Sequence, residues 1–140
     1  MAEILKFNDG FKEFAVNGDE SRIVRFNPCD FAIAERANAS AKRLEKIEAK
    51  YKKAEDENTV DFEKISAECD SEIRSEINAV FGNDVCTPAF GDTNCLSLAG
   101  GSPIFDNFLN AMLDIVKKEI DKETSKSKKR ISVYTNQVKK

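Results

Sequence analysis

The residues of this chain that could do chemistry are four cysteines, Cys29, Cys69, Cys86 and Cys95, in a sequence without histidine. They are separated by 40, 17 and 9 residues. Structural zinc sites usually bring cysteines in pairs two to four residues apart, so this spacing does not indicate zinc. Cys69 falls on an apolar helical stripe, where a thiol behaves as a small hydrophobic side chain. We expect neither a metal nor a cofactor.

The absence of histidine also removes the usual general base of catalysis near neutral pH. No Cys-x-x-Cys redox motif is present, and the many carboxylates lie among lysines on helix faces. We therefore expect no enzymatic activity. The alternative is thiol chemistry at Cys86 or Cys95, which a variant with all four cysteines changed to serine would test.

Glycines that could cradle a phosphate occur in two places. The stretch "AGGSP" at 99–103 precedes a helix, whose N-terminus could hold an anion, but it lacks the lysine of a P-loop and the full Gly-x-Gly-x-x-Gly pattern. The stretch "FGNDVCTPAFGDTN" at 81–94 places Gly82 and Gly91 after phenylalanines. We expect these glycines to cap the ends of helical turns around a short connector helix, with no cofactor bound.

The elements that position these residues are mainly helical. Phe11 to Phe26 predicts a β-hairpin around the turn at 17–19. A long helix follows to about Asp56, with Asn27 as its cap and Pro28 in its first turn. A second helix begins after Asn58 or Thr59, and the pair predicts an antiparallel helical hairpin. The predicted apolar stripes are Ala37, Ala41, Leu44, Ile47, Tyr51 and Ala54, then Phe62, Ile65, Cys69, Ile73, Ile77 and Val80.

The C-terminal amphipathic helix is the most apolar of the chain. Ser102 suits its N-cap and Pro103 its first position. Its broad apolar face predicts either a partner-binding surface or the protein's own core, and both remain open. The residues that we expect on a binding face are Phe105, Phe108, Leu109, Met112 and Val116. If they are core, binding falls to the basic tail or to the helical hairpin.

Charge divides the chain into a domain and a tail. Residues 122–140 carry seven Lys or Arg against one Glu, a net charge of +6, so residues 1–121 carry −9 of the total of −3. We expect one mostly helical domain over 1–121 and a basic, flexible tail over 122–140. The tail is short and has one aromatic residue, so we do not expect nucleic-acid binding. No apolar run approaches the ~20 residues that cross a membrane, and the N-terminus does not read as a signal peptide, which predicts a cytoplasmic protein.

The order of these features resembles a family of small proteins encoded in the tail morphogenesis region of tailed phages and prophages of Gram-positive bacteria. The residues that carry the resemblance are the connector "VFGNDVCTPAFGDTN", the amphipathic helix after it, and a basic tail with "VYTNQVKK", here with Tyr134 and Asn136.

The resemblance implies a tail assembly chaperone. Such proteins bind the long tape-measure protein in the infected cell and keep it soluble until the tube subunits polymerise around it. Coating a long client would also favour self-association. The alternative is a structural tail or connector subunit that stays in the virion. Neither function needs an active site.

Overall fold

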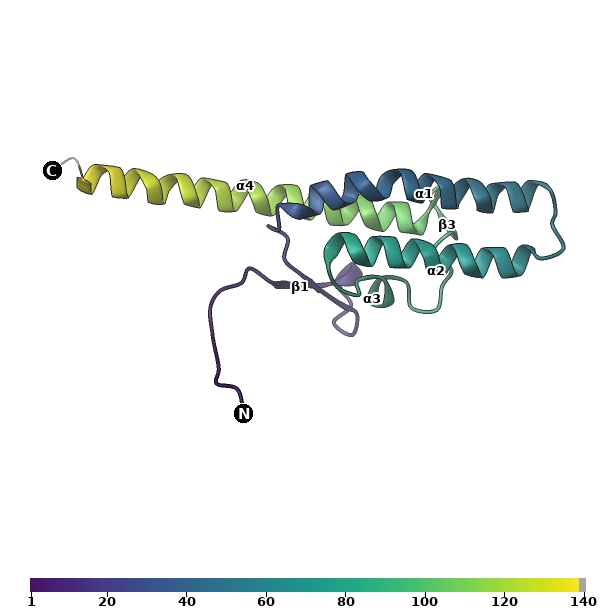
Figure 1. Cartoon of the computed structure of the whole chain (residues 1–140), viewed down its shortest axis with the longest axis horizontal. Coiled ribbons are helices and arrows are strands. Elements are labelled where there is room, and N and C mark those ends of the chain that lie inside the picture. The colour runs from purple at the N-terminus through teal and green to yellow at the C-terminus, as the bar shows by residue number, and fades with distance from the viewer. Residues whose placement is uncertain (139–140) are drawn as a thin grey trace.

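The computed structural model describes residues 1–138, and for 129–138 it describes the backbone alone. The chain is mainly helical, with an N-terminal two-stranded hairpin, a helical hairpin, a short helix and a long C-terminal helix (Figure 1). This is the fold class that the sequence predicts. The first residues form an extended arm that leads away from the packed body, and the last helix projects from the same end of the body in a different direction (Figure 1).

The β-hairpin is the predicted one at 11–26. Strands β1 (Lys12–Ala15) and β2 (Ile23–Phe26) pair antiparallel, with Phe14 opposite Val24. The turn between them includes a short 3-10 segment, Val16–Gly18, in which Asn17 has a φ of 52°. A two-stranded sheet is marginal alone, so it needs a surface to pack on. Phe26 is fully buried and touches the rings of Phe14 and Phe81 at centroid distances of 5.5 and 5.4 Å, which fixes the hairpin to the helical body.

Helix α1 (Ala32–Asp56) begins later than predicted. Asn27 does not cap the helix; its Oδ1 accepts a hydrogen bond from the backbone N–H of Cys29 and closes a separate turn. Asp30 then accepts from the N–H of Ala32 at 2.9 Å and supplies the negative charge at the start of the helix. The predicted stripe is confirmed at Leu44 and Ala54, which are buried, and differs at one position, where Ser40 is buried and Ala41 is exposed.

Helix α2 (Phe62–Phe81) runs back along α1 and completes the predicted antiparallel helical hairpin (Figure 1). Glu76 joins the two helices, since its carboxylate accepts from Ser40 Oγ and Arg43 Nε, both at 2.8 Å. The predicted cap is confirmed at Gly82, which has a φ of 72° and donates its N–H to the Asn78 carbonyl. The predicted start is displaced: helix residues begin at Phe62, whose N–H bonds the Thr59 carbonyl.

The segment before the last helix differs from the prediction. Ser102 and Pro103 are neither the cap nor the first turn of a helix, because they form strand β4 (Ser102–Pro103), paired with β3 (Leu98–Ala99) around two glycines of positive φ. Helix α4 starts one residue later, at Ile104. The short helix α3 (Cys86–Phe90) was predicted, and it lies between Gly82 and Gly91.

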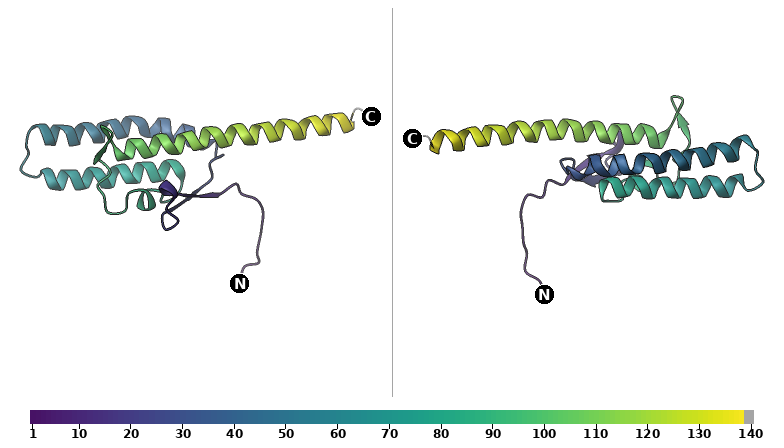
Figure 2. Two further views of the ribbon diagram at one scale, coloured as in Figure 1. Left: turned by 180° about the vertical axis from the view of Figure 1, so that it is seen from behind. Right: turned by 45° about the horizontal axis from the view of Figure 1, so that its top comes forward.

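Helix α4 (Ile104–Val138) has two unlike halves. The first half lies against the helical hairpin, and the second extends beyond the body (Figures 1 and 2). The predicted boundary between domain and tail at 121/122 is therefore not a break in structure, because one helix continues through it. The flexibility of 122–140 stays a prediction, and Lys139 and Lys140 lie outside the described residues.

Candidate interaction surfaces

The apolar face of α4 packs against the chain's own core. Phe105, Met112 and Val116 are 3%, 2% and 7% exposed, in one cluster with the buried residues of α2. Phe108 and Leu109 are partly buried and pack against the same cluster. The ring of Phe108 meets that of Phe90 edge-on, with centroids 5.3 Å apart. Three of the five predicted residues are thus buried in the chain's own core, and a role of this face in binding a partner stays a prediction.

Most of the cysteines lie in the core as small apolar side chains. Cys69, Cys86 and Cys95 are buried, while Cys29 is partly exposed. Burial raises the pKa of Cys86 to about 12 and that of Cys95 still further above its ordinary value. A thiol must lose its proton to act as a nucleophile, so these environments oppose thiolate chemistry at neutral pH. Among the described residues, no three His, Cys, Asp or Glu side chains group as metal ligands would.

The glycine-rich connector is held together by its own side chains. Asn78 Oδ1 accepts hydrogen bonds from the backbone N–H groups of Val85 and Cys86, at 2.9 and 3.1 Å. Asp84 accepts from the N–H of Thr87 at 3.0 Å. These bonds satisfy the N–H groups at the start of α3, which would otherwise have been open to a ligand. Those N–H groups are therefore engaged within the chain.

The second half of the connector is fixed by Arg74. Its guanidinium donates to the carbonyls of Gly91 and Thr93 at 3.0 and 2.7 Å, and to the Asp70 carboxylate at 3.1 Å. Asp70 also accepts from the backbone N–H of Cys95 at 2.8 Å. Although burial alone would raise the pKa of Asp70, the hydrogen bonds from Cys95 and Arg74 outweigh it and lower that pKa. These hydrogen bonds give the connector a structural role.

At the start of α4, where an anion could have been held, backbone N–H groups are also bonded within the chain. The N–H of Ile104 donates to the Ser97 carbonyl at 2.8 Å, and the N–H of Phe105 donates to the Cys95 carbonyl at 3.0 Å. The loop before the helix thus satisfies donors that an anion would have needed. No buried side-chain polar atom in the described part of the chain lacks a hydrogen-bond partner.

Apolar side chains are exposed mainly in the N-terminal arm and beside its root. Ile4, Leu5 and Phe7 are 93%, 86% and 70% exposed, and Phe31, just before α1, is 75% exposed. A groove of about 710 Å³ lies at the root of the arm, between it, the start of α1 and α4. Sequence reasoning missed this region. The signal was "EILKF" at 3–7, an apolar cluster that no predicted element absorbs.

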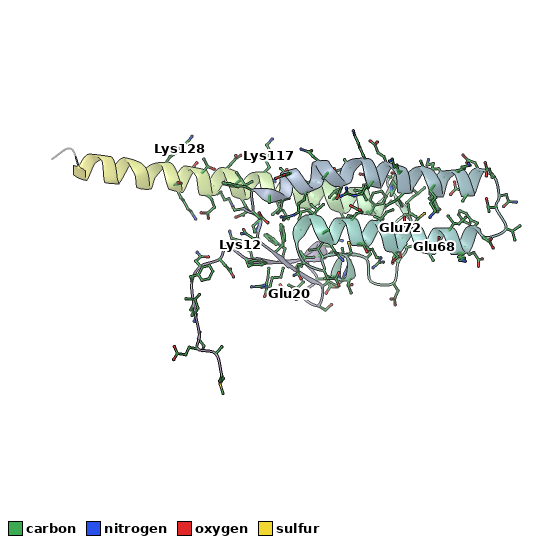
Figure 3. All side chains as sticks on the ribbon, viewed as in Figure 1. Lys12, Glu20, Glu68, Glu72, Lys117 and Lys128 are labelled. Atoms are coloured by element: carbon green, nitrogen blue, oxygen red, sulfur yellow. The ribbon has the colours of Figure 1, made fainter. Side chains whose placement is uncertain are left out.

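The second half of α4 is the other exposed feature. Every residue from Asp121 to Lys128 is exposed, and the helix projects from the body at this point, as the position of Lys128 beyond Lys117 shows (Figure 3). Among the side chains that the structure describes, Lys122 and Lys126 pair with carboxylates one turn earlier on the same helix, at 3.6 and 3.7 Å. Exposed pairs of this kind add little stability, so the charges remain available to a partner.

No described helix has the length and apolar character needed to cross a membrane. Comparisons of the sequence and the structure with protein-family models, curated proteins and solved structures find no match. The N-terminal arm and the second half of α4 are the two exposed features that could receive a partner.

Proposed function

We propose that this chain is a non-enzymatic binding protein of the cytoplasm, a tail assembly chaperone that holds the tape-measure protein during phage tail morphogenesis. The resemblance of the connector and of the tail around Tyr134 and Asn136 motivates this assignment. The single observation that carries the binding role is the second half of α4, a helix that extends beyond the body and in which every residue from Asp121 to Lys128 is exposed (Figure 1).

The free helix has the composition of a docking element. From 122 to 138 it extends about 25 Å at 1.5 Å per residue. Its five Lys or Arg oppose one Glu in that range. The sequence also places Ile131, Tyr134 and Val138 at steps of three and four residues, the spacing of one helical face. A helix gains most of its stability from packing of such a face, so this segment is suited to pair with an amphipathic client.

The opposite charges of the body and of the projecting segment suit them to different roles. The body carries a net charge of −9 over 1–121, and the projecting segment carries the opposite sign. A strongly charged body keeps a complex in solution, while a basic helix attracts the acidic rim of a helical client. The apolar face of α4 supplies the core under this arrangement, and the client is bound at the helix end that the core does not use.

The test is co-expression with the large tape-measure-like protein encoded beside this chain, followed by capture on a tag and size-exclusion chromatography with light scattering. We expect the client to be soluble and to elute with this chain. The variant Lys122→Glu with Lys126→Glu should reduce the captured client about tenfold or more at low salt. These substitutions remove the attraction between the basic segment of α4 and the client.

A matched control changes the same charges on the packed half of the same helix. The variant Lys117→Glu with Lys118→Glu has the same net charge and should retain capture. Equal loss in both variants would show that total charge rather than the projecting segment determines binding. A client that stays insoluble beside the unchanged chain would overturn the chaperone proposal, and presence of the chain in purified virions would favour a structural subunit instead.

A further inference from the structure

The N-terminal arm carries apolar side chains that its own chain does not cover. Three of the first seven residues are large and apolar, and Ile4, Leu5 and Phe7 are each at least 70% exposed. Residues 1–7 form no hydrogen bond with other described residues, while Figure 2 shows the arm leading away from the body in both views. Contiguous exposed apolar residues of this kind indicate a surface that a partner covers.

The root of the arm is fixed, in contrast to its end. Asn27 donates from Nδ2 to the Asp9 carbonyl at 3.2 Å, and Gly10, with a φ of +83°, sits so close to Asn27 that a Cβ would lie 2.9 Å from Oδ1. The guanidinium of Arg25 stacks over the ring of Phe11, 4.6 Å from its centroid. The arm therefore leaves the body at a defined place.

A groove of about 710 Å³ opens at this root. One wall is the arm root itself, from Asn8 to Lys12, and the opposite wall is α4 from Glu123 to Lys128. Phe11 and Phe31 provide apolar surface between these walls, and both are exposed, at 41% and 75%. Its size lies within the ~300–1,000 Å³ range of binding pockets, which is enough for a few apolar side chains.

We propose that two copies of this chain exchange their N-terminal arms, so that residues 4–7 of each copy occupy the groove of the other. A copy cannot readily fill its own groove. Residues 4–7 lead directly into Asn8 and Asp9, whose side chains bond the N–H groups of Gly10 and Phe11 at 3.1 Å and hold the outward path of the chain. Filling the groove within one copy would require a reversal at these residues.

The positions of the arm and the groove on each copy predict the symmetry of the dimer. The arm begins where the groove lies, so an arm that crosses to a neighbour meets that neighbour's arm crossing back. Such a reciprocal contact uses the same surface on both copies and closes as a two-fold dimer. An arm and a groove at opposite ends of the molecule would have produced an open chain instead.

Charges on the arm and on the groove complement one another. Glu3 and Lys6 flank the apolar residues of the arm, and Glu123 and Lys128 lie along the α4 wall. The arm and the α4 wall thus each offer one cation and one anion to the other. The proposal is independent of the identity of any client.

Cross-linking to Cys29 tests the exchange, because this cysteine lines the groove and the other three are buried. The full chain with Leu5→Cys, oxidised mildly at alkaline pH, should give a covalent dimer in most of the protein on a non-reducing gel. The same variant with Cys29→Ser should lose that product. Glu20→Cys, at the far turn of the β-hairpin, is the matched control for random collision and should form less than about a tenth as much dimer.

A cross-link within one copy, seen as a reducible monomer of altered mobility, would overturn the exchange. A ladder of higher species would overturn the two-fold closure. As a second measurement, sedimentation of the unmodified chain should show dimers, and both Leu5→Asp and Phe31→Glu should raise the dimer dissociation constant at least tenfold. A chain that is monomeric at high concentration, with unchanged helical circular dichroism in all variants, would contradict the proposal independently of any cross-link.

Discussion

The packed body and the two segments that leave it differ in the exposure of their side chains. In the body, phenylalanines such as Phe26 and Phe105 are buried, and backbone groups of the connector are bonded to side chains of α2. In the arm, Phe7 is 70% exposed, and in the second half of α4 all described side chains are exposed. Apolar residues that a chain leaves uncovered contribute nothing to its own stability. The difference fits the proposal that the body is a scaffold and that the projecting segments bind partners.

The largest expected effect on stability comes from a substitution in the buried core, compared with one at an exposed position. Phe105→Ala removes a ring from the core and should lower the free energy of unfolding by about 3–5 kcal/mol. Val60→Ala, at a side chain fully exposed between α1 and α2, should change it by less than about 0.5 kcal/mol. Urea denaturation followed by circular dichroism measures both. A small effect of Phe105→Ala would mean that this face of α4 is an accessible surface after all.

The connector should give the next largest effect. Asn78→Ala leaves the N–H groups of Val85 and Cys86 without their acceptor, so the free energy of unfolding should fall by about 1–3 kcal/mol. Asn83→Ala is the matched control, because Asn83 is exposed and its side chain donates one hydrogen bond, to the Arg25 carbonyl. Its effect should be smaller, in the same denaturation experiment. Equal effects would contradict the structural role of Asn78.

These two regions also show what sequence alone could predict. Gly82 after Phe81 indicated the end of α2, and the stripe from Phe62 to Val80 indicated its buried face, because both are local patterns. The role of Asn78 was not predictable, since its partners lie seven and eight residues further on and depend on the path of the connector. The burial of Phe105, on the predicted binding face, was not predictable for the same reason, because it is decided by the packing of α4 on α2.

Other differences have a local physical cause that periodicity does not record. Ser102 and Pro103 have the types of a cap and a first turn, yet Gly100 and Gly101, both with positive φ, turn the chain so that these residues pair with β3. The burial of Ser40 in place of Ala41 depends on Glu76 of the other helix, which accepts its hydroxyl hydrogen. The arm was overlooked because it belongs to no regular element.

Acid should weaken the body through Asp70. The pKa of this carboxyl is lowered below its ordinary 3.8 in the folded protein, so its contribution is fully present above about pH 4 and is lost as the pH falls through the folded value. The difference in free energy of unfolding between the unchanged chain and Asp70→Asn should therefore be constant from pH 7 to about 4 and decrease below it. A difference that grows on acidification would contradict this assignment.

The smallest effect is expected from the projecting helix. Replacing Lys122 and Lys126 by Gln removes two exposed pairs within the helix and should change the free energy of unfolding by less than about 1 kcal/mol. The same variant should weaken capture of the client in the co-expression experiment. A large loss of stability would mean that this segment belongs to the body.

Hydrogen exchange of the backbone amides tests the division into scaffold and projecting segments most directly. The measurement uses the full chain at a dilution where sedimentation shows single copies. We predict strong protection in α1, α2 and the first half of α4, and exchange at least a hundredfold faster in residues 1–7 and 122–138, where few contacts oppose local opening. Protection of either segment equal to that of the core would contradict the account, because that segment would then be part of the folded body.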